Sequence, residues 1–190
     1  MNLAHPERAD WQSAGQELLQ DAMRLQRLVE DLLVLARADR PDAAMQREPA
    51  DIDDLVLREV RRIRQRGAVT IDAAAVSAVQ TNVDRDALTR VVHNLLDNAE
   101  RHARTMVTVS LMSVGDGIEL VVRDDGPGVP TMDRERIFER FARSDEARGR
   151  DSGGSGLGLA IAREIAHAHG GTLELLDTDS GATFRLTLPR

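Results

Sequence analysis

Two asparagines spaced four residues apart are the first side chains in this sequence that point to chemistry. Asn94 and Asn98 lie in HNLLDNAERHA, residues 93–103, and this spacing places both on one face of a helix. Asparagine is a poor helix former, so two on one face suggest a polar task. An amide oxygen is a hard ligand of the kind that Mg²⁺ takes alongside waters and substrate phosphates. A solvated helix face explains the same pattern equally well.

A second candidate is RDDGPGVP, residues 123–130, which follows a predicted strand. Asp124 offers an acceptor for a donor such as the amino group of adenine, and Gly126 and Gly128 permit close approach of a ligand to the backbone. A tight turn is favoured by the same Asp, Gly and Pro composition, and for this segment alone it is the stronger interpretation.

A third candidate is SGGSGLGLAIAREIAHAHGG, residues 152–171, in which glycines lead directly into a helix. Backbone amides at such a helix start form an anion site, and phosphate is the usual ligand. The spacing fits neither the P-loop nor the dinucleotide-binding fingerprint, so a flexible lid without a ligand is an alternative. His167 and His169 are interpreted as ordinary residues at the helix end.

The N-terminal part of the chain predicts one long helix. Apolar residues recur at seven-residue intervals from Asp10 to Ala38, and Asp39-Arg40-Pro41 ends the pattern. Such a sustained seam favours a coiled-coil or bundle partner over packing on its own domain. The polar, proline-flanked residues 41–49 are expected to be a linker.

Residues 50–190 predict a second domain in which strands and helices are segregated, which indicates an α+β layered sandwich. Asp84 is a candidate N-cap and Gly67 a candidate helix end. The expected helices are 51–66, 84–101, a short one at 132–138, and 157–169. The expected strands are 69–72, a hairpin of 106–112 with 118–123, and a hairpin of 172–176 with 182–188.

Composition limits the classes of function. The 190 residues suit one domain with an appendage, and the net charge of −7 argues against a nucleic-acid partner. The absence of cysteine excludes disulfides and thiolate metal sites. No apolar run in the sequence is long enough to cross a bilayer, and the first residues do not resemble a signal peptide. A soluble, cytoplasmic chain is expected, although a parent sensor would be membrane-anchored.

Taken together, the motifs resemble the histidine-kinase branch of the family that includes gyrase-type and Hsp90-type ATPases. That family's N box, first glycine box, F box and second glycine box are matched in order by HNLLDNAERHA, DDGPGVP, IFERF and GSGLGL. The resemblance covers residues 50–190. It implies a two-layer sandwich whose mixed, mostly antiparallel sheet carries helices on one face, preceded here by a coiled-coil-like helix.

The resemblance also implies a role for each matched residue in binding ATP and Mg²⁺. Asn98 is the implied magnesium ligand, Asn94 its polar neighbour, Arg101 the cation that meets the phosphates, and His102 the residue that stacks on adenine. Asp124 is implied to bond the adenine amino group beside Gly126 and Gly128. The residues implied to hold the phosphates are Gly154, Ser155, Gly156, Leu157 and Gly158. Those implied to form the base of a mobile lid are Phe138 and Phe141, with Arg140 as a phosphate contact.

One position separates the branches of this family. The hydrolysing members resemble each other in carrying a glutamate four residues before the magnesium-binding asparagine, and here that residue is Asn94. An amide cannot act as a general base, so efficient hydrolysis is not expected. The nucleophile is expected to be the neutral imidazole of a histidine that attacks the γ-phosphate.

The family's phosphoacceptor motif is absent, and His5 in AHPERAD resembles the turn between two dimerisation helices instead. We therefore expect residues 1–40 to be part of a dimerisation domain, 41–49 a linker, and 50–190 the ATP-binding catalytic domain. The implied partners are an acceptor histidine outside this chain, a response regulator, and a second copy through residues 10–38. The alternatives are an ATP- or ADP-binding module without kinase activity, and a purely structural dimerisation piece.

Overall fold

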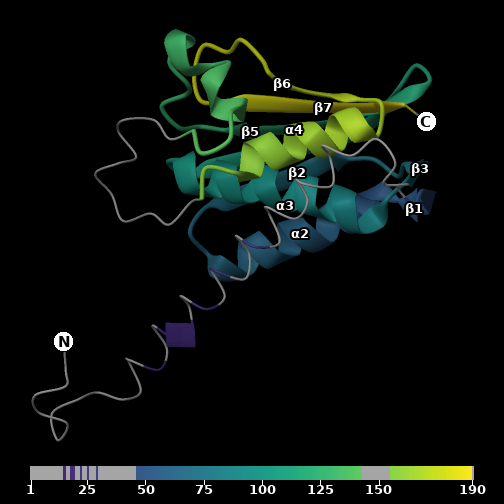
Figure 1. Ribbon diagram of the computed structural model, residues 1–190, viewed down its shortest axis with the longest axis horizontal. Helices are drawn as coiled ribbons and strands as arrows, with labels where there is room; N and C mark the ends of the chain where they lie inside the picture. The colour runs from purple at the N-terminus through teal and green to yellow at the C-terminus, as the bar shows by residue number, and fades with distance from the viewer. Residues whose placement is uncertain are drawn as a thin grey trace, which may run out of the picture.

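The structure, a computed structural model, describes residues 46–142 and 155–189, together with positions 15, 18, 19, 22, 25 and 29 (Figure 1). Its helices are α2 (Ile52–Arg66), α3 (Arg85–His102) and α4 (Gly158–Ala168), with the 3-10 turns η2 (Thr131–Asp133) and η3 (Arg136–Phe138). Its strands are β1 (Glu48–Asp51), β2 (Thr70–Val76), β3 (Gln80–Val83), β4 (Met106–Val114), β5 (Gly117–Asp124), β6 (Thr172–Leu175) and β7 (Thr183–Pro189).

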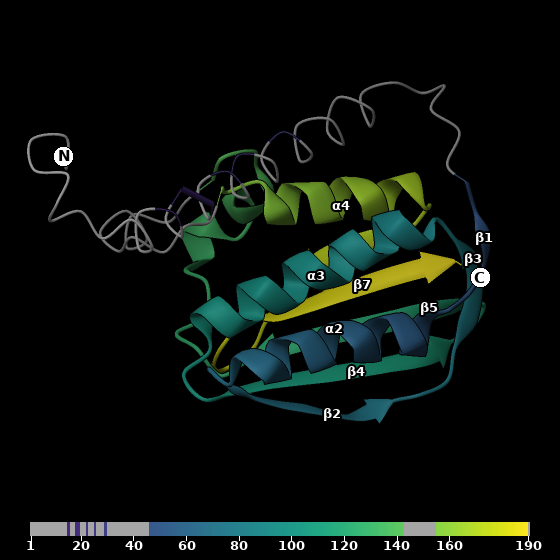
Figure 2. The same cartoon turned by 90° about the horizontal axis from the view of Figure 1, so that it is seen from below.

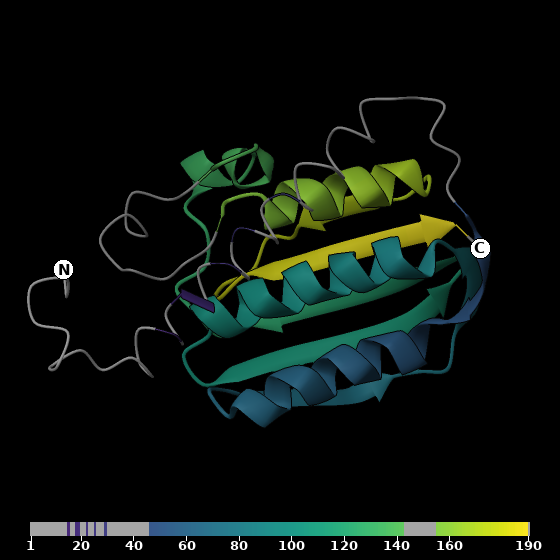
Figure 3. The same cartoon turned by 60° about the horizontal axis from the view of Figure 1, so that its bottom comes forward.

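The strands form a five-stranded sheet in the order β2-β4-β5-β7-β6, beside a separate pair of β1 with β3. Only β2 with β4 is a parallel pair, while β4 with β5, β5 with β7, and β6 with β7 are antiparallel. Figures 2 and 3 show α2, α3 and α4 side by side over one face of this sheet. The α+β sandwich with a mixed, mostly antiparallel sheet is therefore confirmed.

The core lies between the sheet and the three helices, and it is almost entirely aliphatic. On α3 the buried side chains recur at helical spacing, as Leu88, Val91, Val92, Leu95, Leu96 and Ala99. They pack against alternate residues of the sheet, such as Val107, Val109, Leu120 and Val122.

The predicted helices and hairpins of the second domain agree closely with the structure. Gly67 ends α2 in the left-handed region with φ 70°, and the side chain of Asp84 caps α3 by accepting from the Ala87 amide. Four features differ from the predictions. Residues 48 and 49, assigned to the linker, belong to β1, whose partner β3 was not predicted. β2 extends to Val76, and residues 132–138 form two 3-10 turns in place of a short helix.

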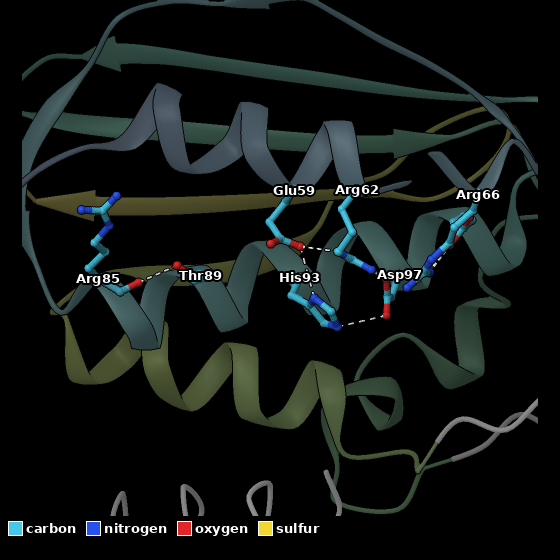
Figure 4. Close-up of polar contacts among 8 residues, drawn as sticks. Glu59, Arg62, Arg66, Arg85, Thr89, His93 and Asp97 are labelled. Atoms are coloured by element: carbon cyan, nitrogen blue, oxygen red, sulfur yellow. Dashed lines mark hydrogen bonds and ion pairs between the residues drawn. The ribbon is translucent and has the colours of Figure 1, made fainter. Parts of the chain in front are cut away.

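A network of charged side chains joins α2 to α3 on their outer surface (Figure 4). Arg62 contacts Glu59 at 2.6 Å and Asp97 at 2.7 Å, and His93 lies 3.2 Å from each of the same two carboxylates. Burial would raise the pKa of Asp97, but hydrogen bonds from His93 and Arg62 outweigh it and hold that pKa well below its usual range. The network fixes the α3 turn that immediately precedes Asn98.

The six described positions in the first 45 residues are helical, and Leu18, Leu19, Leu25 and Val29 among them are exposed. The rest of the predicted helix at 10–38 lies outside the described residues. Of the helices that the structure describes, none combines the length and the apolar character needed to cross a membrane.

The core predicts a strong contrast between two valines. Val91 on α3 is fully buried and Val114 at the end of β4 is half exposed. Val91→Ala removes two buried methyl groups and leaves a cavity, so we expect it to lower the free energy of unfolding by about 2 kcal/mol. Val114→Ala should change it by less than about 0.5 kcal/mol. Urea denaturation of both variants measures this difference. Equal losses of unfolding free energy in the two variants would contradict the burial of Val91 in the core.

Candidate nucleotide-binding site

The C-terminal half of α3 presents the polar residues of the first motif. Asn94 and Asn98 are half-buried on the rim of the α3 apolar stripe, and Arg101 and His102 are exposed at the end of the helix. The Asn94 amide nitrogen donates to the carbonyl oxygen of Gly158 at 3.0 Å. Asn94 therefore attaches the start of α4 to α3 directly, a contact that its spacing alone did not indicate.

Asp124, at the end of β5, is a buried carboxylate with one oxygen bonded and one without a partner. Its Oδ1 accepts from the backbone amides of Gly126 at 2.9 Å and Ala182 at 3.2 Å. Its Oδ2 is buried and makes no hydrogen bond, and the whole residue is only 2% exposed. A buried carboxylate oxygen without a donor is costly, so this atom is suited to a ligand that brings a donor.

Gly126 and Gly128 allow the loop after β5 to lie against two other backbones. A Cβ on Gly126 would stand 2.2 Å from the His102 carbonyl oxygen and 2.7 Å from Asp124 Oδ1. Gly128 has φ +79°, and a Cβ there would stand 2.8 Å from the Gly181 carbonyl oxygen. Any side chain at Gly126 would thus separate the Asp124 loop from the end of α3.

The neighbouring Asp125 has a different, structural task. Its carboxylate accepts from the Arg104 amide at 2.7 Å and from the Thr105 hydroxyl at 2.6 Å, and the Thr105 amide lies 3.0 Å away. The hydrogen bonds from Thr105, first of all that from its hydroxyl, hold the pKa of Asp125 well below its usual range. Asp125 thus fixes the chain where it leaves α3, and Asp124 is the carboxylate with an oxygen free for a ligand.

The glycine-rich turn leads into α4. Gly154 lies outside the described residues. Ser155 accepts from the Leu157 amide at 3.3 Å, and Gly158 begins the helix against Asn94. The Leu157 side chain is fully buried in the core, so its backbone is the part that a phosphate can meet.

The F-box residues, which precede this turn in the sequence, have different surroundings. Phe138 packs edge-to-face on Phe184 of β7, and the guanidinium of Arg163 lies 4.9 Å from the Phe138 ring centre. Phe141 is different, because its side chain is 62% exposed and its φ is +64°. Its amide donates to the Gly156 carbonyl at 3.0 Å, so it joins the turn through its backbone. Arg140, the residue before Phe141, is exposed.

Electrostatics favour a neutral ring at His102. Desolvation lowers the pKa of His102, and the neighbouring charge of Arg101 lowers it further, while Asp124 opposes both. A neutral imidazole near Asp124 is compatible with stacking on a nucleobase.

Two contacts therefore bring the three motifs together. Gly126 lies against the His102 carbonyl, and Asn94 donates to the Gly158 carbonyl, so all three motifs meet along the C-terminal half of α3. Three contributors escaped the sequence analysis, namely Ala182 and Gly181 beside Asp124, and Arg163 over Phe138. Ala182 contributes only a backbone amide, which carries no signal in the sequence. The arrangement offers a buried acceptor, hard amide oxygens, a cation and a glycine-rich helix start, which are the groups that a purine nucleotide with Mg²⁺ needs.

Comparison with known proteins identifies the family. A model described as histidine kinase-, DNA gyrase B- and HSP90-like ATPase matches residues 83–190. The chain belongs to this family. The sensor protein RstB of Escherichia coli is 38% identical over 180 residues, or 92% of this chain and 41% of that protein. The signal transduction histidine-protein kinase/phosphatase MprB of Mycobacterium tuberculosis is 38% identical over 169 residues, or 87% of this chain and 32% of that protein.

Solved structures of sensor kinases share the fold. A mycobacterial MprB structure has 35% identity and a TM-score of 0.68, and the match covers 75% of this chain and 97% of that one. Full-length ShkA, solved in complex with AMPPNP, has 26% identity and a TM-score of 0.80 over 95% of this chain and 39% of that one. The chain contains the catalytic, ATP-binding domain of a sensor histidine kinase, and it spans less than half the length of the curated relatives named above.

The bonding of Asp124 predicts what an asparagine would do in its place. Since two backbone amides occupy Oδ1, the oxygen of Asp124→Asn must stay there, and its NH₂ group must replace Oδ2. The resemblance implies that the donor on the ligand is the adenine amino group, and the new NH₂ group would face it. We therefore expect the affinity for adenosine and ADP to fall about 10- to 100-fold. Calorimetric titration measures this, with Asp116→Asn in the exposed β4–β5 turn as the control. Unchanged affinity in Asp124→Asn would contradict the assignment.

The lowered pKa of Asp125 predicts a stability effect that depends on pH. A depressed folded-state pKa means that the ionised form stabilises the fold above the unfolded pKa of about 3.9, and that this contribution is lost as pH falls through the folded value. The free energy of unfolding of Asp125→Asn should therefore be lower than that of the wild type at pH 7. The difference between the two free energies should decrease below about pH 4. Urea denaturation from pH 7 to pH 2.5 tests this, and a gap that stays constant with pH would refute it.

Proposed function

We propose that this domain binds Mg-ATP and transfers the γ-phosphate to a histidine outside the chain, as part of a two-component system. The buried, unpartnered Oδ2 of Asp124 carries the proposal, because it calls for a donor such as the adenine amino group. The family supports ATP in particular, and the AMPPNP complex of ShkA shows that a relative with this fold takes an adenine nucleotide.

Different site residues would contact different parts of the nucleotide. Asp124 would hold adenine, with His102 stacked on the base and Gly126 and Gly128 shaping the loop beside it. The amides of the turn from Gly154 to Gly158 would hold the phosphates, and the positive end of the α4 dipole favours negative charge there. Phe138 anchors the neighbouring turn to the core through Phe184, and Arg140 on the next turn would reach the phosphates.

Asn98 would be the protein ligand of Mg²⁺, with Arg101 as the phosphate cation. The half-buried amide of Asn98 and the exposed guanidinium of Arg101 both lie on the last turns of α3, next to the Gly126 contact. Bound Mg²⁺ supplies charge neutralisation at the phosphate oxygens. Asn94 donates to Gly158, which supports a role in holding the phosphate turn rather than in activating a water.

Transfer then depends on a nucleophile from elsewhere. A neutral imidazole nitrogen attacks the γ-phosphorus, so that an N–P bond forms as the bond to the bridging oxygen breaks. ADP leaves with the electron pair, and the imidazole loses its proton to solvent. The chain would contribute position and charge to this step, while the acceptor supplies the reactivity.

We further propose that residues 1–40 belong to a dimerisation domain and that a second copy pairs through residues 10–38. The exposed leucines at positions 18, 19 and 25 support this, because a helix with such a seam is stabilised by a partner. The sequence predicts a linker at residues 41–49 and the catalytic domain at 50–190, and because β1 starts at Glu48 we propose that this domain begins two residues earlier. A response regulator would receive the phosphoryl group. The domain would lie on the cytoplasmic side of the membrane, because it needs ATP.

The test is transfer from γ-labelled ATP with Mg²⁺ to a separately supplied dimerisation fragment that carries an acceptor histidine. We expect an acid-labile, base-stable adduct only when the fragment is present. Asn98→Ala should lower the rate by at least about 100-fold, since it removes a metal ligand, and should leave adenosine binding within about twofold. Asn82→Ala on the exposed edge of β3 is the control. ATP binding without any transfer by wild type would favour the non-catalytic nucleotide module instead.

A further inference from the structure

The C-terminal end of α4 carries a buried histidine that the nucleotide site does not contact. His169 is the C-cap of α4, as the sequence indicated, but it is only 2% exposed. Its Nε2 lies 3.1 Å from the backbone nitrogen of Asp84, the N-cap of α3, and its Nδ1 lies 2.8 Å from the Ile165 carbonyl oxygen. An amide only donates and a carbonyl only accepts, so the ring is neutral and its proton is on Nδ1.

This hydrogen bond joins α3 to α4 at one end of α4, and a second polar contact joins them at the other end. α3 and α4 lie side by side and run in opposite directions (Figure 2). At one end Asn94 donates to the Gly158 carbonyl, and at the other the Asp84 amide donates to His169. Apolar residues of both helices fill the space between, including Leu95 and Ile161.

The two end contacts differ in kind from the packing between them. Apolar burial is non-directional, so it holds the helices together without strongly specifying how far one has slid along the other. A hydrogen bond has a preferred length and angle, and it therefore specifies that position. α4 begins at the glycine-rich turn, so a shift of α4 along α3 moves that turn relative to Asn98.

We propose that His169 is a positioning residue for phosphoryl transfer, because it accepts the Asp84 amide and thereby fixes the phosphate-binding turn of α4 against the metal-binding face of α3. The inference rests on the proposed function and adds a second point of control, at the far end of α4 from the nucleotide.

Protonation of His169 would break this contact. A proton on Nε2 would face the Asp84 N–H, donor against donor. The charged groups that face the ring in the described part of the chain are Asp84 and Arg47, and Arg47 Nη2 also donates to the Ala168 carbonyl at 2.9 Å. Burial lowers the pKa of His169 and Arg47 lowers it further, while the Ile165 carbonyl and Asp84 raise it. The contact is therefore complete above the ordinary value of about 6.5 and is lost as pH falls through the lowered folded value.

Two substitutions separate positioning from simple stability. Glutamine can place an oxygen near the position of Nε2, whereas leucine fills similar space without an acceptor. His169→Leu should lower ADP affinity about 3- to 10-fold, the scale of one net hydrogen bond, and leave adenosine affinity unchanged, because only the phosphates meet α4. His169→Gln should restore most of the loss. The same two changes at His167, exposed on the same helix end, are the controls.

A measurement on the wild type avoids dependence on a variant that folds poorly. Nuclear magnetic resonance follows the Asn94 side-chain amide and the Gly158 backbone amide without nucleotide, between pH 7.5 and pH 5. We expect both signals to shift with one apparent pKa below about 6.5, together with the His169 ring, and the shift to vanish in His169→Gln. In Arg47→Ala the midpoint should move to higher pH, because the cation that opposes protonation is gone.

The outcomes are distinguishable. Loss of ADP affinity without loss of adenosine affinity, rescue by glutamine and the coupled pH shift together support the inference. Equal loss of both ligands in His169→Leu, or Asn94 and Gly158 signals that do not follow the His169 titration, would overturn it. A wild-type domain that binds no ADP at all would instead overturn the proposed function, and the nucleotide-free pH titration would still test the contact between the helices.

Discussion

The buried carboxylate of Asp124 is the interaction on which the rest of the site depends. Two backbone amides, one from its own loop and one from Ala182 just before β7, donate to Oδ1, and this brings the end of β5 and the start of β7 together. The contact requires near-contact of backbones, which only glycine at positions 126 and 181 permits. Because the Gly126 loop also lies against the His102 carbonyl, the same carboxylate determines where α3 can end. The buried Asp124 carboxylate and the C-terminal end of α3 are thus parts of one constraint.

A second layer of organisation is the separation of tasks between adjacent residues. Asp124 is buried, and its Oδ2 has no hydrogen-bond partner. Both carboxylate oxygens of Asp125 accept hydrogen bonds from backbone and hydroxyl groups of the turn after α3. Asp97 belongs to the ionic network with α2, and Asn98, the next residue, lies on the rim that faces the site. In each pair a structural residue fixes the backbone of a neighbour that is a candidate for binding a ligand, as a precise polar site requires.

The sequence predicted what is encoded by local periodicity and by motifs. The helices at 52–66 and 85–102 and both hairpins have strong patterns of buried residues, and the order of the motifs indicated the family. β1 and β3 were missed because each is only four residues long and their partners are far apart in the sequence, so no local pattern announces them. His169 appeared ordinary because its importance comes from Asp84, 85 positions away. The exposure of Phe141 was also hidden, since its contact with Gly156 is made by the backbone.

That last contact has a consequence for how the domain can vary. The Phe141 amide donates to the Gly156 carbonyl at 3.0 Å, so a backbone hydrogen bond holds these two positions together. The entropy of closing a flexible loop rises only by about 0.6 kcal/mol for each doubling of its length. The segment between these two residues can therefore be exchanged for a shorter or a longer one at little cost to the core. The two described positions can thus keep their 3.0 Å contact while the sequence between them varies in length.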